Sequence, residues 1–326
     1  MQPFHSIKTN SPVRPTVKPW RFLLRGVVCR LCLLTSMLLP PWAHAAADKS
    51  GAVAEQPSAL LGLNFGLAVG NQQDQYVAAQ QLAALLGKAV HQKMLWEGGF
   101  NLAKAQAVAR DGAIPFSFAF IKPPNLTAAL LAKGWHLVAE CEDTIHFGTD
   151  LIAPACPGQP GKVLLGGDSL SILGMNGHTP QACVDPDQVW HSSSAVMLAP
   201  KEGSLVDLVA QKIWREHGVQ PRQIARVQTQ NAVIGLMREM HVAAVGVVTP
   251  VVARAWAAQG GIVLAHRPMP FWALVAAPGV SAQAITDARD ALMSPSAATV
   301  NKALHLPGWT HGDPAAYADF LKWLKG

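Results

Sequence analysis

Residues 243–254 have the sequence AAVGVVTPVVAR, and this stretch decides the fold class of the chain. Its first six residues are small or β-branched, which is typical of a strand buried on both faces. Thr249 and Pro250 follow at once and indicate a helix start, because a hydroxyl residue can cap a helix and proline suits the first helical position. A buried strand that leads directly into a helix predicts an α/β protein with a parallel sheet.

The same alternation of strand-like and helix-like segments continues on both sides of this stretch. Further strands are expected at 60–68, 90–96, 115–120, 135–141, 195–199, 224–228, 262–265 and 271–276. Residues 154–192 interrupt the pattern, since they are rich in Gly, Pro, Ser, Asp and His and show little periodicity. The two runs predict two lobes, each a mostly parallel sheet flanked by helices. We assign 58–145 and 277–326 to lobe 1, and 146–276 to lobe 2, with the irregular excursion 154–192 inside lobe 2.

The first 47 residues have a different composition from the rest. Their only charged side chains are basic, an apolar run follows at 31–39, and small residues fill 43–47. This order is typical of a secretory signal peptide, and the apolar run is well short of the roughly 20 residues that a membrane-spanning helix needs. We expect cleavage after Ala45 or Ala47 and a mature protein in the periplasm.

Removing this leader changes the charge of the protein. The chain has 26 Lys and Arg residues and 20 Asp and Glu residues. Six basic residues and no acidic ones lie in the leader, so the mature part carries 20 of each. A neutral mature protein lacks the basic surface that nucleic-acid binding requires, and we exclude nucleic acid as a partner.

Three cysteines lie outside the leader. Cys156 and Cys183 bracket a segment rich in Gly and Pro, and an exported chain meets an oxidising compartment in which a disulfide is stable. The spacing alone does not fix the pairing, but we expect a disulfide between these two. Cys141, at the end of an apolar strand, is expected to be a buried free thiol.

Sequence motifs for cofactors and metals are missing. The glycines do not form G-x-G-x-x-G, and neither a P-loop nor H-E-x-x-H occurs. The histidines are scattered without the spacing of metal ligands. We therefore expect no cofactor and no metal site. The sequence GDSLS at 167–171 is similar to the nucleophile block of GDSL esterases, so a secreted serine hydrolase that uses Ser169 is an alternative function, although the block lies mid-chain and no matching D-x-x-H follows.

Polar residues cluster where the expected strands lead into helices. In open α/β sheets, ligands bind outside the carboxyl ends of the strands, where helix N-termini present free N–H groups and a positive dipole end. These junctions supply the candidate ligand-binding residues Asn71, Gln72, Ser117, Lys122, Gly203, Ser204, Thr229, Asn231 and Thr249. We expect an uncharged cleft that binds its ligand mainly through hydroxyl and amide groups.

Three stretches carry a resemblance to a known family. They are 60–87, with Tyr76 early in its helix; LAPKEGSL at 198–205; and 243–254 followed by PFWA at 270–273. Their order resembles the type II periplasmic binding proteins, in particular the phosphonate-type substrate-binding branch. The resemblance implies two lobes that close around a ligand by hinge motion, joined by two crossing strands near 145–152 and 271–276.

The resemblance also implies a function and further site residues. Ser204 and Thr229 match positions that hold an oxyanion, and Asn71 and Tyr76 match the ligand-binding region of the first lobe. We expect a monomeric, non-catalytic periplasmic receptor that captures a small polar or anionic ligand, such as a phosphonate- or phosphate-like oxyanion. Its partner would be an inner-membrane ABC permease; a periplasmic sensor or accessory binding subunit with the same fold is the alternative role.

Overall fold

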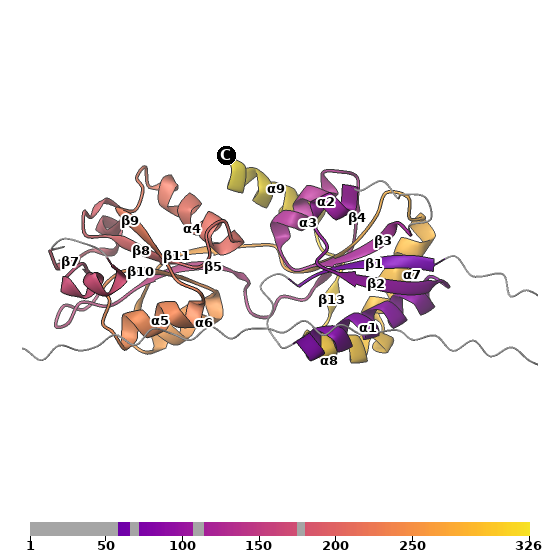
Figure 1. Ribbon diagram of the computed structural model, residues 1–326, viewed down its shortest axis with the longest axis horizontal. Helices are drawn as coiled ribbons and strands as arrows, with labels where there is room; N and C mark the ends of the chain where they lie inside the picture. The colour runs from indigo at the N-terminus through magenta and orange to yellow at the C-terminus, as the bar shows by residue number, and fades with distance from the viewer. Residues whose placement is uncertain (1–57, 66–71, 107–113, 175–179) are drawn as a thin grey trace, which may run out of the picture. The chain divides into compact units, whose positions relative to one another are not determined.

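The computed structural model describes residues 58–65, 72–106, 114–174 and 180–326 (Figure 1). The expected leader, residues 1–47, lies outside the described residues, as does Asn71. Within the described ranges, no helix combines the length and the apolar character needed to cross a membrane.

The first sheet has six strands in the order β13-β4-β12-β3-β1-β2. These strands are β1 (Ser58–Asn64), β2 (Lys93–Gly98), β3 (Phe116–Ile121), β4 (His136–Cys141), β12 (Ala273–Ala276) and β13 (Trp309–Thr310). β1 pairs in parallel with both β2 and β3, whereas β12 is antiparallel to β3 and β4. The sheet is therefore mixed, and its parallel half consists of β1, β2 and β3.

Helices cover both faces of this sheet (Figure 1). They are α1 (Gln72–Ala89), α2 (Leu102–Gln106), α3 (Pro124–Leu131), α7 (Ala282–Met293), α8 (Ala298–Leu304) and α9 (Pro314–Lys325). α1, α7 and α8 pack on one face, and α2, α3 and α9 on the other. α1 forms this contact because Ala78, Ala79, Leu82 and Leu86 recur at helical spacing, and all four are buried.

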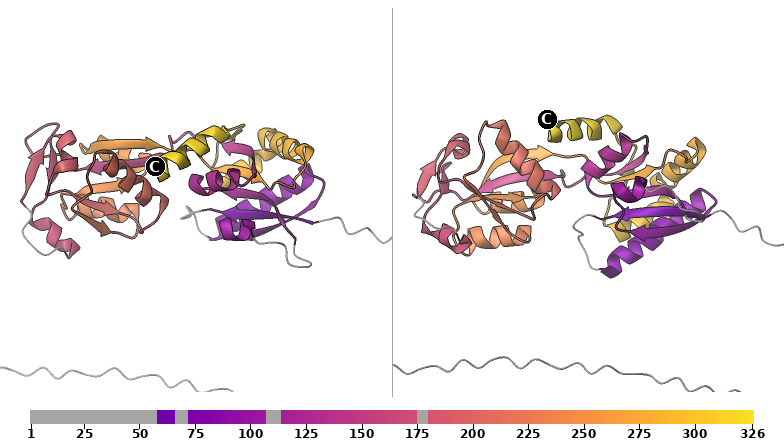
Figure 2. Two further views of the ribbon diagram at one scale, coloured as in Figure 1. Left: turned by 90° about the horizontal axis from the view of Figure 1, so that it is seen from above. Right: turned by 45° about the horizontal axis from the view of Figure 1, so that its top comes forward.

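The second sheet has five strands in the order β11-β5-β10-β8-β9. They are β5 (Gly148–Ala153), β8 (Val196–Ala199), β9 (Gln223–Arg226), β10 (Val245–Val248) and β11 (Ile262–Pro268). α4 (Leu205–Glu216) covers one face, while α5 (Gln230–Arg238) and α6 (Pro250–Ala258) cover the other (Figure 2). Every residue of β8 and β10 is buried, as the apolar runs in the sequence predict.

The excursion at 154–192 contains a small structure of its own. β6 (Val163–Leu165) and β7 (Ala182–Val184) form an antiparallel pair, and the short 3₁₀ helices η1 (Asp168–Leu173) and η2 (Pro186–His191) flank it. The predicted disulfide between Cys156 and Cys183 is confirmed, with the two Cα atoms 5.7 Å apart. Cys141 is a buried free thiol, as expected.

The predicted boundary between the lobes needs a correction. β12 at 273–276 pairs with β3 and β4, so these residues belong to the first sheet and not to lobe 2. The chain passes between the sheets at 142–147 and 269–272, outside the strands themselves. The apolar pattern of β12 predicts a strand buried on both faces, but such a pattern carries no information about which sheet the strand joins.

Candidate functional site

Each sheet contains a point where the connections change direction. In the first sheet β1 lies between β2 and β3, so the chain winds first to one side of β1 and then to the other. In the second sheet β8 lies in the same way between β9 and β10. Ligands of open α/β sheets bind in the crevice outside the carboxyl ends of the strands at such a switch point. The two expected crevices lie beyond the ends of β1 and β3, and of β8 and β10.

A cavity of about 930 Å³ lies at both crevices. Phe65 and Lys122, which follow β1 and β3, line it together with Pro200 and Thr249, which follow β8 and β10. Its other lining residues are Asp74, Gln75, Ala78, Ile145, Phe147, Val206, Gln228, Thr229, Gln230, Asn231, Pro250, Val251, Val252, Trp272, Ala303, Leu304 and His305. We call this cavity the cleft.

Lys122 supplies a positive charge to the first-lobe side of the cleft, which Asp74 also lines. Its Nζ lies 3.8 Å from the ring centroid of Trp272 and 5.6 Å from that of Phe65, which are cation–π distances. Burial lowers the pKa of Lys122 from 10.5 to about 8, and the nearby Cys141 acts in the opposite direction. The side chain is therefore an ammonium at neutral pH, held over aromatic rings that attract its charge but accept no conventional hydrogen bond.

The N-termini of α5 and α6 form the second-lobe side of the cleft. The Thr229 Oγ1 accepts a hydrogen bond from Ala232 N–H at 3.2 Å and so caps α5. The Thr249 N–H and hydroxyl both donate to Gln230 Oε1, at 2.8 and 3.0 Å. Gln230 is thereby held with its carbonyl towards the start of α6, which leaves its NH₂ group as the donor of that side chain. Two positive helix ends thus line the same cavity as Lys122.

Solved structures with a similar fold are known, although no family model matches the chain and no curated protein matches its sequence significantly. A Xanthomonas citri protein bound to ATP is 12% identical with a TM-score of 0.53, over 83% of this chain and 98% of that one. PhnD1 from Prochlorococcus marinus, in complex with methylphosphonate, is 10% identical with a TM-score of 0.53, over 82% and 97%. A TctC solute-binding protein from Polaromonas is 12% identical with a TM-score of 0.50, over 82% and 94%.

The chain has the two-lobed fold of periplasmic binding proteins. At these identities the likeness concerns the fold alone.

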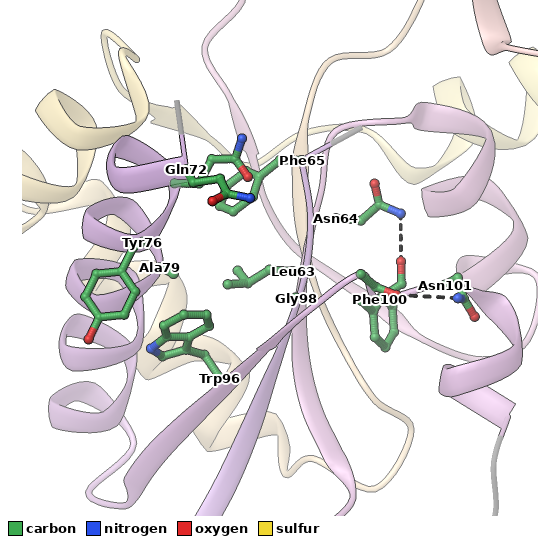
Figure 3. A pocket seen from close by; sticks show the side chains of 12 residues that line it. Leu63, Asn64, Phe65, Gln72, Tyr76, Ala79, Trp96, Gly98, Phe100 and Asn101 are labelled. Atoms are coloured by element: carbon green, nitrogen blue, oxygen red, sulfur yellow. Dashed lines mark hydrogen bonds between the residues drawn. The ribbon is translucent and has the colours of Figure 1, made fainter. Parts of the chain in front are cut away.

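The candidate residues from the sequence divide into several groups. Lys122, Thr229, Asn231 and Thr249 come together at the cleft. Gln72 and Tyr76 line a second, smaller cavity of about 510 Å³ in the first lobe (Figure 3).

Gly203 and Ser204 are not among the residues that line either cavity. The Ser204 Oγ is buried and has no hydrogen-bond partner within the described part of the chain. The Gly203 N–H donates instead to the carboxylate of Asp207 at 2.9 Å. The pattern of Ser204 followed by Asp207 predicts a capping box, but α4 has no side-chain capping hydrogen bond, and Asp207 instead holds Gly203, the residue before the N-cap. Pro200, at the start of the same loop, is the residue that lines the cleft.

Ser117 lies at the wrong end of its strand for this site. It is the second residue of β3, and its carbonyl accepts a hydrogen bond from Ala277 N–H at 2.9 Å. Lys122 follows the last residue of the same strand. At about 3.3 Å per residue, the two positions are about 16 Å apart along the strand. Ser117 therefore belongs to the opposite edge of the sheet.

Several cleft residues were not selected from the sequence. Trp272 and Phe65 are aromatic residues next to apolar strands, and such residues are typical of a core. Gln230 falls within a predicted helix start but was not chosen as a ligand-binding residue. The prediction of an uncharged cleft is wrong, because Lys122 and Asp74 line it.

The hydrolase alternative rests on Ser169. The backbone at this position belongs to η1, but its side chain lies outside what the structure describes. In the described ranges, no group of three or more His, Cys, Asp and Glu side chains is close enough together to hold a metal ion. The use of Ser169 as a nucleophile stays a prediction from the sequence.

Proposed function

We propose that this chain is a periplasmic receptor that captures a small organic anion in the cleft and releases it unchanged. The observation that carries the proposal is the position of Lys122, an ammonium held over Trp272 at the switch point of the first sheet. The N-termini of α5 and α6 line the same cavity and add positive dipole ends. One half-buried ammonium and two helix ends at the same cavity support the recognition of an anion.

The apolar part of the lining favours an organic anion over a bare inorganic one. Ile145, Phe147, Val206, Val251 and Trp272 all contribute to the cleft. Apolar walls lower the local dielectric and strengthen the attraction between an ammonium and an anion. They also stabilise a ligand that has an apolar body, since its burial removes apolar surface from water.

The hydroxyl groups at the cleft support binding without catalysis. The Thr229 Oγ1 accepts from a backbone N–H, and the Thr249 hydroxyl donates to an amide carbonyl. An activated nucleophile needs a base beside it, and an amide carbonyl is too weak a base for this role.

The ligands of two structural neighbours agree with an anion site. One neighbour was solved with methylphosphonate and another with ATP, and both molecules carry phosphorus oxyanions. We propose a phosphonate- or sulfonate-like ligand for this chain, delivered by a monomeric receptor to an ABC-type permease in the inner membrane. A sensor that presents its bound state to another membrane protein is the alternative role. Co-purification with a permease or with a sensor kinase distinguishes the two.

The Lys122→Gln variant tests the proposal directly. We expect it to bind methylphosphonate about 30-fold more weakly than wild type, because a hydrogen bond to a charged group is worth about 2 kcal/mol. Isothermal titration calorimetry of the purified mature protein measures this change. Lys133→Gln is the matched control, since Lys133 is exposed just after α3, and it should bind as wild type does. Equal affinity in the two variants would contradict the assignment of the cleft.

The pH dependence of binding gives a second test. Methanesulfonate keeps its single charge across the range, so only the protein titrates. We expect constant affinity below the Lys122 pKa of about 8 and, above it, a fall of up to about tenfold per pH unit.

The folding stability of the ligand-free protein should change with pH in the opposite direction to the affinity. Between pH 8 and 10.5 the unfolded chain holds a proton that the folded chain has released, so this group makes the stability rise with pH. Both trends should disappear in Lys122→Gln, and a pH-independent affinity in wild type would contradict the role of Lys122.

A further inference from the structure

The second cavity adjoins the cleft. Its volume is about 510 Å³, and it lies at the carboxyl ends of β1 and β2, against the first turns of α1 (Figure 3). Phe65 and Gln75 line both cavities, so they stand at the boundary between them. The two cavities are therefore neighbours that share this part of their lining.

Two aromatic side chains form one wall of the second cavity. Tyr76 comes from α1 and Trp96 from β2, and their ring centroids are 5.4 Å apart in an edge-to-face arrangement (Figure 3). Tyr76 is 50% exposed, so about half of its surface remains accessible to a further contact. Two partly exposed rings that already adopt a favourable aromatic geometry provide a surface on which a third ring can pack.

The remaining lining of the second cavity is uncharged and combines apolar side chains with amide groups. Gln72, Gln75 and Tyr76 lie three and four residues apart and so share one face of α1. Across the cavity, the Asn64 Nδ2 donates to the Phe100 carbonyl at 2.7 Å. Gly98 leaves its backbone accessible, because a Cβ atom added there would meet nothing within 4 Å. Amide groups and bare backbone recognise the polar edge of a ring and do not select for charge.

We propose that the second cavity binds a planar unsaturated ring of the ligand, while Lys122 holds its anionic group in the cleft. This inference rests on the proposed function and narrows the ligand to a small organic anion that carries such a ring. The two parts of the ligand are assigned from the lining of each cavity. Lys122 and the two helix ends line the cleft, and the partly exposed aromatic pair lines the second cavity. Neither lining alone matches such a ligand, but the shared boundary joins them.

The test compares methylphosphonate with phenylphosphonate by calorimetry, at one pH. We expect wild type to bind phenylphosphonate about tenfold more tightly, since a well-placed ring contact is worth about one factor of ten. In Trp96→Ala and in Tyr76→Ala this preference should vanish while the affinity for methylphosphonate stays within about twofold. Leu95→Ala is the matched control, because Leu95 is exposed and precedes Trp96 on the opposite face of β2. It should keep the full preference.

The possible outcomes separate the two proposals. If wild type binds both probes equally, or if both aromatic variants keep the preference, the ring site is wrong and the anion site still stands. If neither probe binds wild type, the proposed function fails and the ring site fails with it. If Trp96→Ala does not fold, Tyr76→Ala alone tests the ring site. This variant should fold, because half of the Tyr76 surface is already exposed in the native protein and little packing is lost.

Discussion

Replacing Asp207 by alanine is expected to destabilise the protein by about 3 kcal/mol, because it leaves a partly buried guanidinium without its counter-ion. Asp207 is fully buried, and its carboxylate accepts hydrogen bonds from Arg226 Nη1 at 2.5 Å, Gly203 N–H at 2.9 Å and Gln211 Nε2 at 3.0 Å. The Arg226 side chain is 31% exposed, so water offsets part of the loss. Urea unfolding at constant pH measures the change in the free energy of unfolding.

Two control variants separate the loss of the buried charge from the general effect of removing an aspartate. Asp290→Ala removes an exposed aspartate from α7 and should change the stability by no more than about 0.5 kcal/mol. Asp207→Asn keeps an acceptor for the Gly203 N–H but loses the charge, so its stability should fall between wild type and Asp207→Ala. An Asp207→Ala protein as stable as Asp290→Ala would show that the buried network contributes little.

The Asp207 network also shapes the cleft. Arg226 Nη1 donates to the Pro200 carbonyl at 3.2 Å as well as to Asp207. The loop from Pro200 to Gly203 is thus fixed at both ends, and Pro200 lines the cleft. The hydrogen bonds within residues 200–207 therefore fix the loop in place. The resemblance to type II periplasmic binding proteins instead assigned a ligand contact in this loop to Ser204. A serine followed three residues later by an acidic residue has the same appearance in a helix cap and in an oxyanion site, so the sequence does not separate the two.

The parts of the structure that depend on local sequence were predictable. The strand β10 and the start of α6 follow from the run of apolar residues before Thr249 and Pro250. The Thr229 cap of α5 follows from a hydroxyl residue placed before an amphipathic segment. Fold class and the number of lobes follow in turn, because alternating strands and helices leave few possible architectures.

The parts that depend on pairing between distant strands were not predictable. Lys122 and Trp272 are 150 positions apart, and each alone has an ordinary explanation as a surface cation or a core aromatic residue. The antiparallel register that pairs Ala273 with Ile121 brings them together at one edge of the sheet. No periodicity within either segment indicates this register. The same limitation explains why Ser117 was grouped with Lys122, since the polar ends of β3 lie at opposite edges of the sheet.

Loss of the disulfide is expected to reduce the stability by about 3.5 kcal/mol, because the bond restricts the unfolded chain. Cys156 and Cys183 are 27 positions apart, and the entropy lost by an unfolded chain on closing a loop grows with the logarithm of its length. The double variant Cys156→Ser/Cys183→Ser should unfold at lower urea concentration than wild type. Wild type in reductant should behave in the same way, and reductant should not affect the double variant further.

The free thiol provides the control for this experiment. Cys141→Ala removes a buried sulfhydryl in the first lobe but leaves the disulfide intact. It should therefore keep the full response to reductant, even if the lost packing lowers its stability at the outset. Neither cysteine of the bond lines the cleft, so the folded double variant should bind methylphosphonate with the affinity of wild type. A loss of binding at temperatures where the double variant is folded would mean that the excursion at 154–192 shapes the ligand site as well as stabilising the second lobe.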